Sequence, residues 1–128
     1  MTGNKLLIDT NIVIELFKGD MQIAAVLEAQ EKVYIPAVVL GELYLGAYRS
    51  NNLQKKLLEI KNFLPKCIIL NVDNTTAENY GIIKTGLLNK GKPIPENDIW
   101  IGATAIHYQL PLYTNDAHFK EVEGLELV

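Results

Sequence analysis

The sequence has one cysteine and two histidines, and these small numbers exclude several kinds of site. The lone thiol, Cys67, cannot form an internal disulfide, and we expect it to be a small buried apolar side chain. Zinc sites need more histidine and cysteine ligands than this chain can bring together. Because unpaired cysteine is typical of reducing compartments, we expect the protein to be cytoplasmic.

Long apolar runs are missing as well. No stretch reaches the roughly eighteen consecutive apolar residues of a membrane span, and the opening MTGNKLLID lacks the apolar region and cleavage site of a secretory signal. The composition is otherwise ordinary, with 48% apolar and 21% charged residues. A chain of 128 residues therefore predicts one soluble domain over residues 1–128, without membrane association.

An excess of positive charge is also absent, since the formal net charge is −3. This balance argues against nucleic-acid binding, but without the four acidic residues singled out below the charge would be +1. The lysines and the single arginine gather mainly at 49–66 and 84–92, where they form either a basic face or solvated helix surfaces. Net charge alone does not decide the function.

Short apolar runs rich in β-branched residues predict strands, and spaced apolar residues with capping residues predict helices. The expected strands lie at 6–8, 33–35, 67–72 and 110–114, with a further edge strand considered at 125–128. The expected helices lie at 11–18, 21–30, 36–50, 53–64, 74–89 and 96–108, with a short one at 117–122. Their alternation predicts an α/β domain with a mostly parallel sheet.

Four acidic residues stand where such a sheet gathers ligands. Asp9 follows the first strand, and Asp116 follows the strand at 110–114. Asp98 falls in the first turn of its helix, and Glu42 falls in the first half of its own. Because helices in these folds run antiparallel to the strands, we expect all four at the carboxyl edge of the sheet, where open α/β folds bind ligands.

Neighbouring carboxylates repel one another unless a cation lies among them. Mg²⁺ or Mn²⁺ suits this role, with one or two ions bound, because both prefer oxygen ligands. We expect hydrolysis of a phosphodiester by a metal-activated water, leaving a 5′-phosphate and a 3′-hydroxyl, without a catalytic histidine or cysteine. Products with a 2′,3′-cyclic phosphate would rule this mechanism out. The site chemistry alone leaves RNA and DNA equally open as substrates.

Each acid also has a structural interpretation. Asp9, Asp98 and Asp116 can cap helices or stabilise a helix dipole. Glu42 is harder to explain in this way, because it interrupts an apolar helix face with no lysine or arginine within one turn. An unpartnered carboxylate buried there would be costly. Capping does not explain why four acids should converge.

Polar residues beside two of the acids are candidates to orient them: Thr10, Asn11, Thr114 and Asn115. Their hydroxyl and amide groups can hydrogen-bond to carboxylates, although ordinary turn formation explains the asparagines equally well. His107 and His118 are expected at the surface or in packing, with only a small chance that His118 touches substrate. Trp100 is expected in the core rather than stacked on a base.

Four segments of the sequence resemble the PIN-domain family: Leu7-Ile8-Asp9-Thr10-Asn11, the helix around Glu42, Asn97-Asp98-Ile99-Trp100-Ile101 and Thr114-Asn115-Asp116-Ala117-His118-Phe119. Within the family, the likeness is strongest to the VapC-type toxins of prokaryotic toxin–antitoxin modules. Each motif is weak alone, but their order and spacing are specific and extend over essentially the whole chain.

This resemblance implies a three-layer α/β/α fold and Mg²⁺- or Mn²⁺-dependent endoribonuclease activity on RNA. It also implies a homodimer and a small antitoxin protein that occupies the active site. Metal binding and catalysis are assigned by the resemblance to four acids, with one supporting hydroxyl: Asp9, Glu42, Asp98 and Asp116, and Thr114. The main departure is Gly102, where relatives often have alanine, and we expect it to be harmless.

Other functions remain open at this level. A phosphatase would use Asp9 as a nucleophile, but a second aspartate two residues on and a lysine near the last acid are missing. A non-catalytic RNA- or protein-binding module would share the fold without needing the complete acidic set. A nucleotide-binding Rossmann domain is disfavoured because no glycine-rich loop follows the first strand.

Overall fold

The computed structural model describes residues 5–128, and a parallel sheet of four strands runs through this part of the chain. The strand order is β3-β2-β1-β4, with β1 at Leu7–Ile8, β2 at Val33–Pro36, β3 at Cys67–Leu70 and β4 at Leu112–Tyr113. From β1 the chain builds outward to β2 and β3, and it later returns to add β4 on the other side of β1. The order of the strands therefore reverses between β1 and β4, and ligands of open α/β sheets bind at such a switch point.

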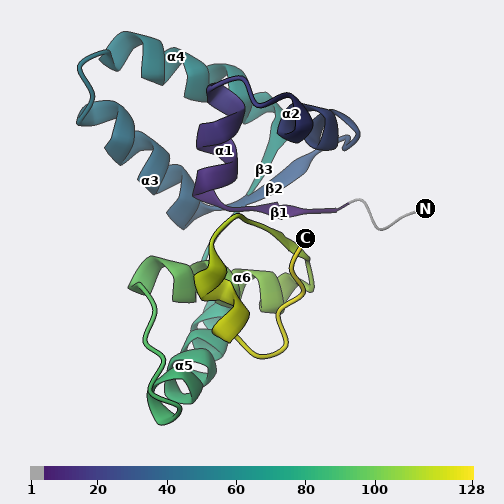
Figure 1. Cartoon of the computed structure of the whole chain (residues 1–128), viewed down its shortest axis with the longest axis vertical. Coiled ribbons are helices and arrows are strands. Elements are labelled where there is room, and N and C mark those ends of the chain that lie inside the picture. The colour runs from purple at the N-terminus through teal and green to yellow at the C-terminus, as the bar shows by residue number, and fades with distance from the viewer. Residues whose placement is uncertain (1–4) are drawn as a thin grey trace.

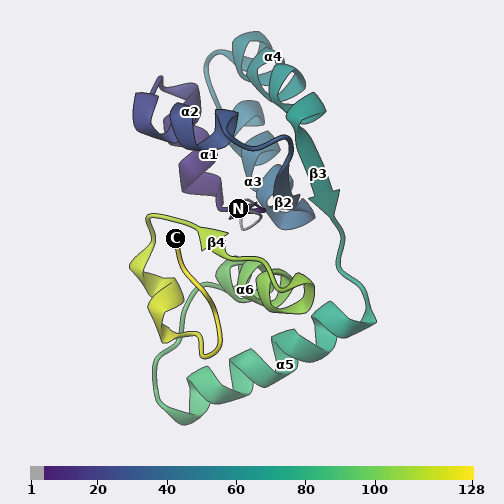
Figure 2. The same cartoon turned by 90° about the vertical axis from the view of Figure 1, so that its right-hand side faces the viewer.

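Helices cover both faces of the sheet (Figure 1). On one side lie α1 at Thr10–Phe17, α2 at Met21–Glu28, α3 at Ala37–Tyr48 and α4 at Leu53–Phe63. On the other side lie α5 at Asn74–Asn89 and α6 at Glu96–Tyr108, with α5 running along α6 in Figure 2. Short 3₁₀ helices follow α4 and β4, namely η1 at Leu64–Lys66 and η2 at Ala117–Glu121. The predicted three-layer α/β/α arrangement is confirmed.

The core explains why β1 is apolar throughout. Leu7 and Ile8 are fully buried, because helices cover the central strand from both sides. The main cluster joins the sheet to the helices α1 to α4, whereas a smaller cluster lies between α5 and α6 and includes Ile83, Leu87 and Ile99. Among residues 5–128, no helix is long and apolar enough to cross a membrane.

Aspartates mark the starts of several helices. Asp9, Asp20, Asp73 and Asp116 each accept a hydrogen bond from a backbone N–H at the beginning of α1, α2, α5 and η2. Such caps satisfy donors that have no partner within the helix. Asp9 directly follows β1, and Asp116 lies three residues after the end of β4, so both of these helix caps lie at the carboxyl edge of the sheet.

Three strands differ from the sequence-based expectation. The strand expected at 67–72 ends at Leu70, the one at 110–114 keeps only Leu112–Tyr113, and 125–128 adds only a bridge between Leu112 and Leu127. The cause is the length of the neighbouring strands. β2 pairs with β3 only from Val33 to Pro36, so residues beyond Leu70 have no partner in β2.

The surroundings of two side chains, Trp100 and Cys67, also differ from expectation. Trp100 is half-buried and stacks on Tyr80, with ring centroids 4.1 Å apart, rather than lying in the core. Cys67 is likewise half-buried, and burial raises the pKa of its thiol to about 12. His107 is a packing residue, as expected, and its Nδ1 shares a 2.8 Å hydrogen bond with the hydroxyl of Thr76.

Candidate active site

Four acidic side chains meet at the carboxyl edge of the sheet, beside the switch point. Asp9 follows β1, Asp116 precedes η2, Asp98 lies in the first turn of α6 and Glu42 lies in the second turn of α3. They share one shallow cavity of about 200 Å³, which is lined by Asp9, Thr10, Asn11, Ile14, Glu42, Asp98 and Asp116. The structure therefore brings together every acid that the sequence singled out, although they come from four separate elements.

Asp9 is the most buried of the four and is held by three hydrogen bonds. Its residue exposure is 4%. The backbone N–H of Thr10 donates to one carboxylate oxygen at 2.7 Å, while the hydroxyl of Thr114 and the amide of Asn11 donate to the other at 2.7 Å and 3.2 Å. A carboxylate with this many donors has a fixed orientation, which a ligand of a metal ion requires.

Glu42 connects α3 to α1 and α6. The hydroxyl of Thr10 donates a hydrogen bond of 2.5 Å to Glu42 Oε1, and the amide of Asn97 donates one of 3.4 Å to Oε2. The expectation that Glu42 interrupts a buried apolar face is wrong, because Glu42 is half-buried and Leu45, three residues on, is 58% exposed. Polar neighbours at the cavity satisfy this carboxylate.

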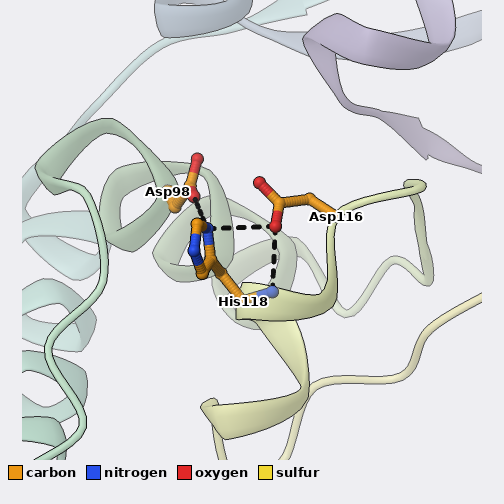
Figure 3. A group of neighbouring side chains, drawn as sticks. All are labelled: Asp98, Asp116 and His118. Atoms are coloured by element: carbon orange, nitrogen blue, oxygen red, sulfur yellow. Dashed lines mark hydrogen bonds and ion pairs between the residues drawn. The ribbon is translucent and has the colours of Figure 1, made fainter.

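Asp98 and Asp116 both approach the ring of His118 (Figure 3). The Nδ1 atom of His118 lies 3.3 Å from Asp98 Oδ2 and 3.0 Å from Asp116 Oδ1. Asp116 Oδ1 also accepts a 2.9 Å hydrogen bond from the backbone N–H of His118, so this carboxylate caps η2 and faces the site at once. From the sequence we expected His118 at the surface, yet its ring contacts two carboxylates of the site.

Burial and neighbouring carboxylates raise the pKa of two of the acids, Asp98 and Asp9. For Asp98, burial is the largest cause of a pKa raised to about 6, followed by repulsion from Asp116 and Asp9, with His118 acting in the opposite direction. Burial also raises the pKa of Asp9, against the hydrogen bonds from Thr114 and Thr10 that lower it. Within residues 5–128, no lysine or arginine pairs with any of the four acids. The cavity therefore concentrates negative charge that is not paired with lysine or arginine.

The donor set of this cavity suits a hard divalent cation. Four carboxylates offer oxygen ligands, which Mg²⁺ and Mn²⁺ prefer. A bound cation would also relieve the repulsion that raises the pKa of Asp98. The residues present thus fit such an ion, with Asp9, Glu42, Asp98 and Asp116 as the candidate ligands.

The supporting residues fall near their predicted places. Thr114 bridges two acids, since its hydroxyl donates to Asp9 and accepts a 2.9 Å hydrogen bond from the backbone N–H of Asp116. Asn11 also binds the loop after β4, because its Oδ1 accepts a 3.2 Å hydrogen bond from the backbone N–H of Asn115. The part of Asn115 in this network is its backbone rather than the side chain that the sequence suggested.

Sequence reasoning missed two residues of the site, Asn97 and His118. Asn97 directly precedes Asp98 in the exposed first turn of α6, which placed it next to the predicted site. His118 stands two residues after Asp116, and its backbone N–H donates to the Asp116 carboxylate that caps η2. In both cases the signal was adjacency to a predicted acid at a helix start.

Comparisons with known proteins show the family to which this chain belongs. Residues 6–125 match the family model of the PIN domain. The chain is similar to Ribonuclease VapC2 of Haemophilus influenzae, at 34% identity over 124 residues that cover 94% of each chain. It is also similar to the tRNA(fMet)-specific endonuclease VapC of Shigella flexneri, at 32% identity over 126 residues and 94% of each chain.

Solved structures give the same result. VapBC2 from Rickettsia felis, bound to a DNA fragment from its promoter, superposes with a TM-score of 0.92 at 28% identity and 96% coverage of both chains. DNA-bound VapBC from Salmonella typhimurium superposes with a TM-score of 0.92 at 26% identity, covering 97% of this chain and 96% of that one. The chain therefore belongs to the PIN-domain family and, within it, to the VapC-type ribonuclease toxins of toxin–antitoxin systems.

Proposed function

We propose that this ribonuclease depends on one or two Mg²⁺ or Mn²⁺ ions held by Asp9, Glu42, Asp98 and Asp116, and that residues 1–128 form one nuclease domain. The observation that carries the proposal is the convergence of these four carboxylates in one cavity, with no ion pair to a lysine or arginine among residues 5–128. The raised pKa of Asp98 adds to it, because buried carboxylates in this arrangement favour a cation.

The chemistry proposed is hydrolysis of a phosphodiester bond in RNA. A bound divalent ion would supply the charge that activates water and neutralises the phosphate oxygens. The protein's own part is orientation: Thr114 and Asn11 fix the carboxylate of Asp9, and Thr10 and Asn97 fix that of Glu42. No general acid or base from the chain is needed for such a step, and the expected products carry a 5′-phosphate and a 3′-hydroxyl.

We further propose that the partner of this chain is a small antitoxin protein and that the toxin forms a homodimer in the cytoplasm. The support for the antitoxin comes from relatives, since VapBC complexes and a toxin–antitoxin complex from Klebsiella pneumoniae share this fold. The homodimer is what the resemblance to VapC-type toxins implies. The description of the Shigella flexneri relative as tRNA(fMet)-specific makes transfer RNA the first substrate to test.

Sequencing of RNA ends in cells that express the wild type or Asp98→Asn tests this function. We expect new 5′-phosphate ends at defined sites with the wild type only. Ends with a 2′,3′-cyclic phosphate would contradict the mechanism. The absence of cleavage by purified wild type in Mg²⁺ or Mn²⁺, with RNA still bound, would instead favour a non-catalytic binding module.

A phosphatase is distinguished in the same preparation. The purified wild type is expected to cleave RNA and to leave a generic phosphomonoester intact. Turnover of the phosphomonoester, lost in Asp9→Asn while RNA stays uncut, would favour Asp9 as a nucleophile over the nuclease function.

A further inference from the structure

His118 has no part in the proposed four-carboxylate site, yet its ring lies beside two of the four carboxylates. The Nδ1 atom is 3.3 Å from Asp98 Oδ2 and 3.0 Å from Asp116 Oδ1 (Figure 3). In the tautomer that carries its hydrogen on Nε2, the Nδ1 atom offers a lone pair. This nitrogen and the two carboxylate oxygens are then three possible ligand atoms beside one another.

The spacing of these atoms is that of ligands around one ion. Two adjacent ligands of an octahedral ion with bonds of about 2.1 Å lie about 3.0 Å apart. The two His118 contacts, at 3.3 Å and 3.0 Å, are close to this value, and suitable ligand atoms of Asp98, Asp116 and His118 all lie within 4.8 Å of one another. Small side-chain rotations would suffice to admit a cation.

The backbone around His118 holds the ring in place. On one side, Asp116 caps η2 through the backbone N–H of His118. On the other side, Phe119 is fully buried and anchors η2 in the core. The imidazole itself is 52% exposed, so an ion can reach it from solvent.

We propose that His118 is a nitrogen ligand, shared with Asp98 and Asp116, of a divalent ion in the active site. This inference rests on the proposed metal dependence and deepens it, because it gives one ion position a mixed nitrogen and oxygen donor set. An imidazole ligand favours first-row transition ions over Mg²⁺. The site would accordingly hold Mn²⁺ more tightly than four carboxylates alone.

A structural role for His118 makes different predictions. If the ring only tied the two carboxylates together by hydrogen bonding, a bound ion would displace it, and no nitrogen would be coordinated. The two cases differ in a spectroscopic property of the ion, independent of RNA cleavage.

Pulsed electron paramagnetic resonance of Mn²⁺ bound to the tag-free, full-length protein separates them. We expect the wild type to show modulation from a coordinated nitrogen, and protein with ¹⁵N-labelled histidine to show the ¹⁵N pattern instead. His118→Gln should lose the signal. His107→Gln is the matched control, because His107 is the other histidine and binds Thr76, and it should keep the signal.

Titration with each ion gives a second readout on the same proteins. His118→Gln is expected to weaken Mn²⁺ binding by roughly 10-fold and Mg²⁺ binding by less than about 3-fold. Mn²⁺ that binds the wild type without nitrogen modulation, or modulation that persists in His118→Gln, would overturn the inference while leaving the nuclease function intact. Failure of the wild type to bind Mn²⁺ or Mg²⁺ at all would overturn both.

Discussion

The ionised carboxylate of Asp98, buried in the site, lowers the free energy of unfolding of the protein. Its side chain is 12% exposed and lies near two other acids, which is why its pKa is raised to about 6. Unfolded, the same group titrates near its ordinary value of 3.8. Ionisation therefore favours the unfolded chain: the penalty is complete above pH 6, shrinks as the pH falls, and is gone below 3.8.

Asp98→Asn should consequently stabilise the metal-free protein. At pH 7.5 with a chelator present, we expect its free energy of unfolding, measured by urea denaturation, to exceed that of the wild type by about 1–3 kcal/mol. The reason is that asparagine does not ionise, so the penalty for the buried charged carboxylate is removed. The gain should disappear at pH 3.5 and in saturating Mg²⁺, which stabilises the wild type. Lower stability of Asp98→Asn at pH 7.5 without metal would show that the ionised carboxylate does not destabilise the folded protein.

Thr114 acts through the acids on either side of it. Thr114→Val keeps the shape of the side chain but removes the hydroxyl between Asp9 and the backbone of Asp116. We expect a loss of roughly 10- to 100-fold in metal affinity and cleavage rate, the usual effect of losing a group that orients a ligand. Thr114→Ser should restore most of both, and a valine variant with wild-type affinity would exclude the orienting role.

At the scale of elements, a few aspartates combine two tasks. Asp9 and Asp116 begin α1 and η2 and also face the cavity, whereas Asp20 begins α2 without lining it. The same type of cap is therefore purely structural at Asp20, which follows a helix, and part of the site at Asp9 and Asp116, which follow strands. Only position relative to the sheet separates the two cases.

Asp20→Ala isolates the purely structural task. Loss of the 3.0 Å hydrogen bond to the backbone N–H of Ile23 should lower the free energy of unfolding by about 1 kcal/mol, within the 0.5–2 kcal/mol typical of N-caps. Urea denaturation measures this change, and metal affinity and RNA cleavage should remain at wild-type values. A large loss of cleavage in a variant that is still fully folded would mean that α2 contributes to the site.

The sequence predicted helices and the place of the acids better than it predicted strands and contacts. Apolar periodicity and caps are local, so α6 was placed at its observed bounds, Glu96–Tyr108. The length of β4 depends on hydrogen bonds to β1 and was overestimated for that reason. Contacts between distant elements left no local pattern, which is why the half-exposed state of Glu42 and the position of His118 were missed.

At the scale of the whole molecule, the order of the strands places the site. Because β1 lies between β2 and β4, the turns after β1 and β4 meet, and Asp9 and Asp116 meet with them. The helices α3 and α6, one on each side of the sheet, then add Glu42 and Asp98. The fold thus concentrates negative charge from all three layers at one edge.

Direct titration of Mn²⁺ into the purified wild type, Asp9→Asn and Asp98→Asn tests most directly whether these distant carboxylates share a cation. Saturable binding by the wild type is expected, with affinity reduced by roughly 10-fold or more in each variant, since each removes a ligand from a different element. Binding by both variants with wild-type affinity would contradict the account.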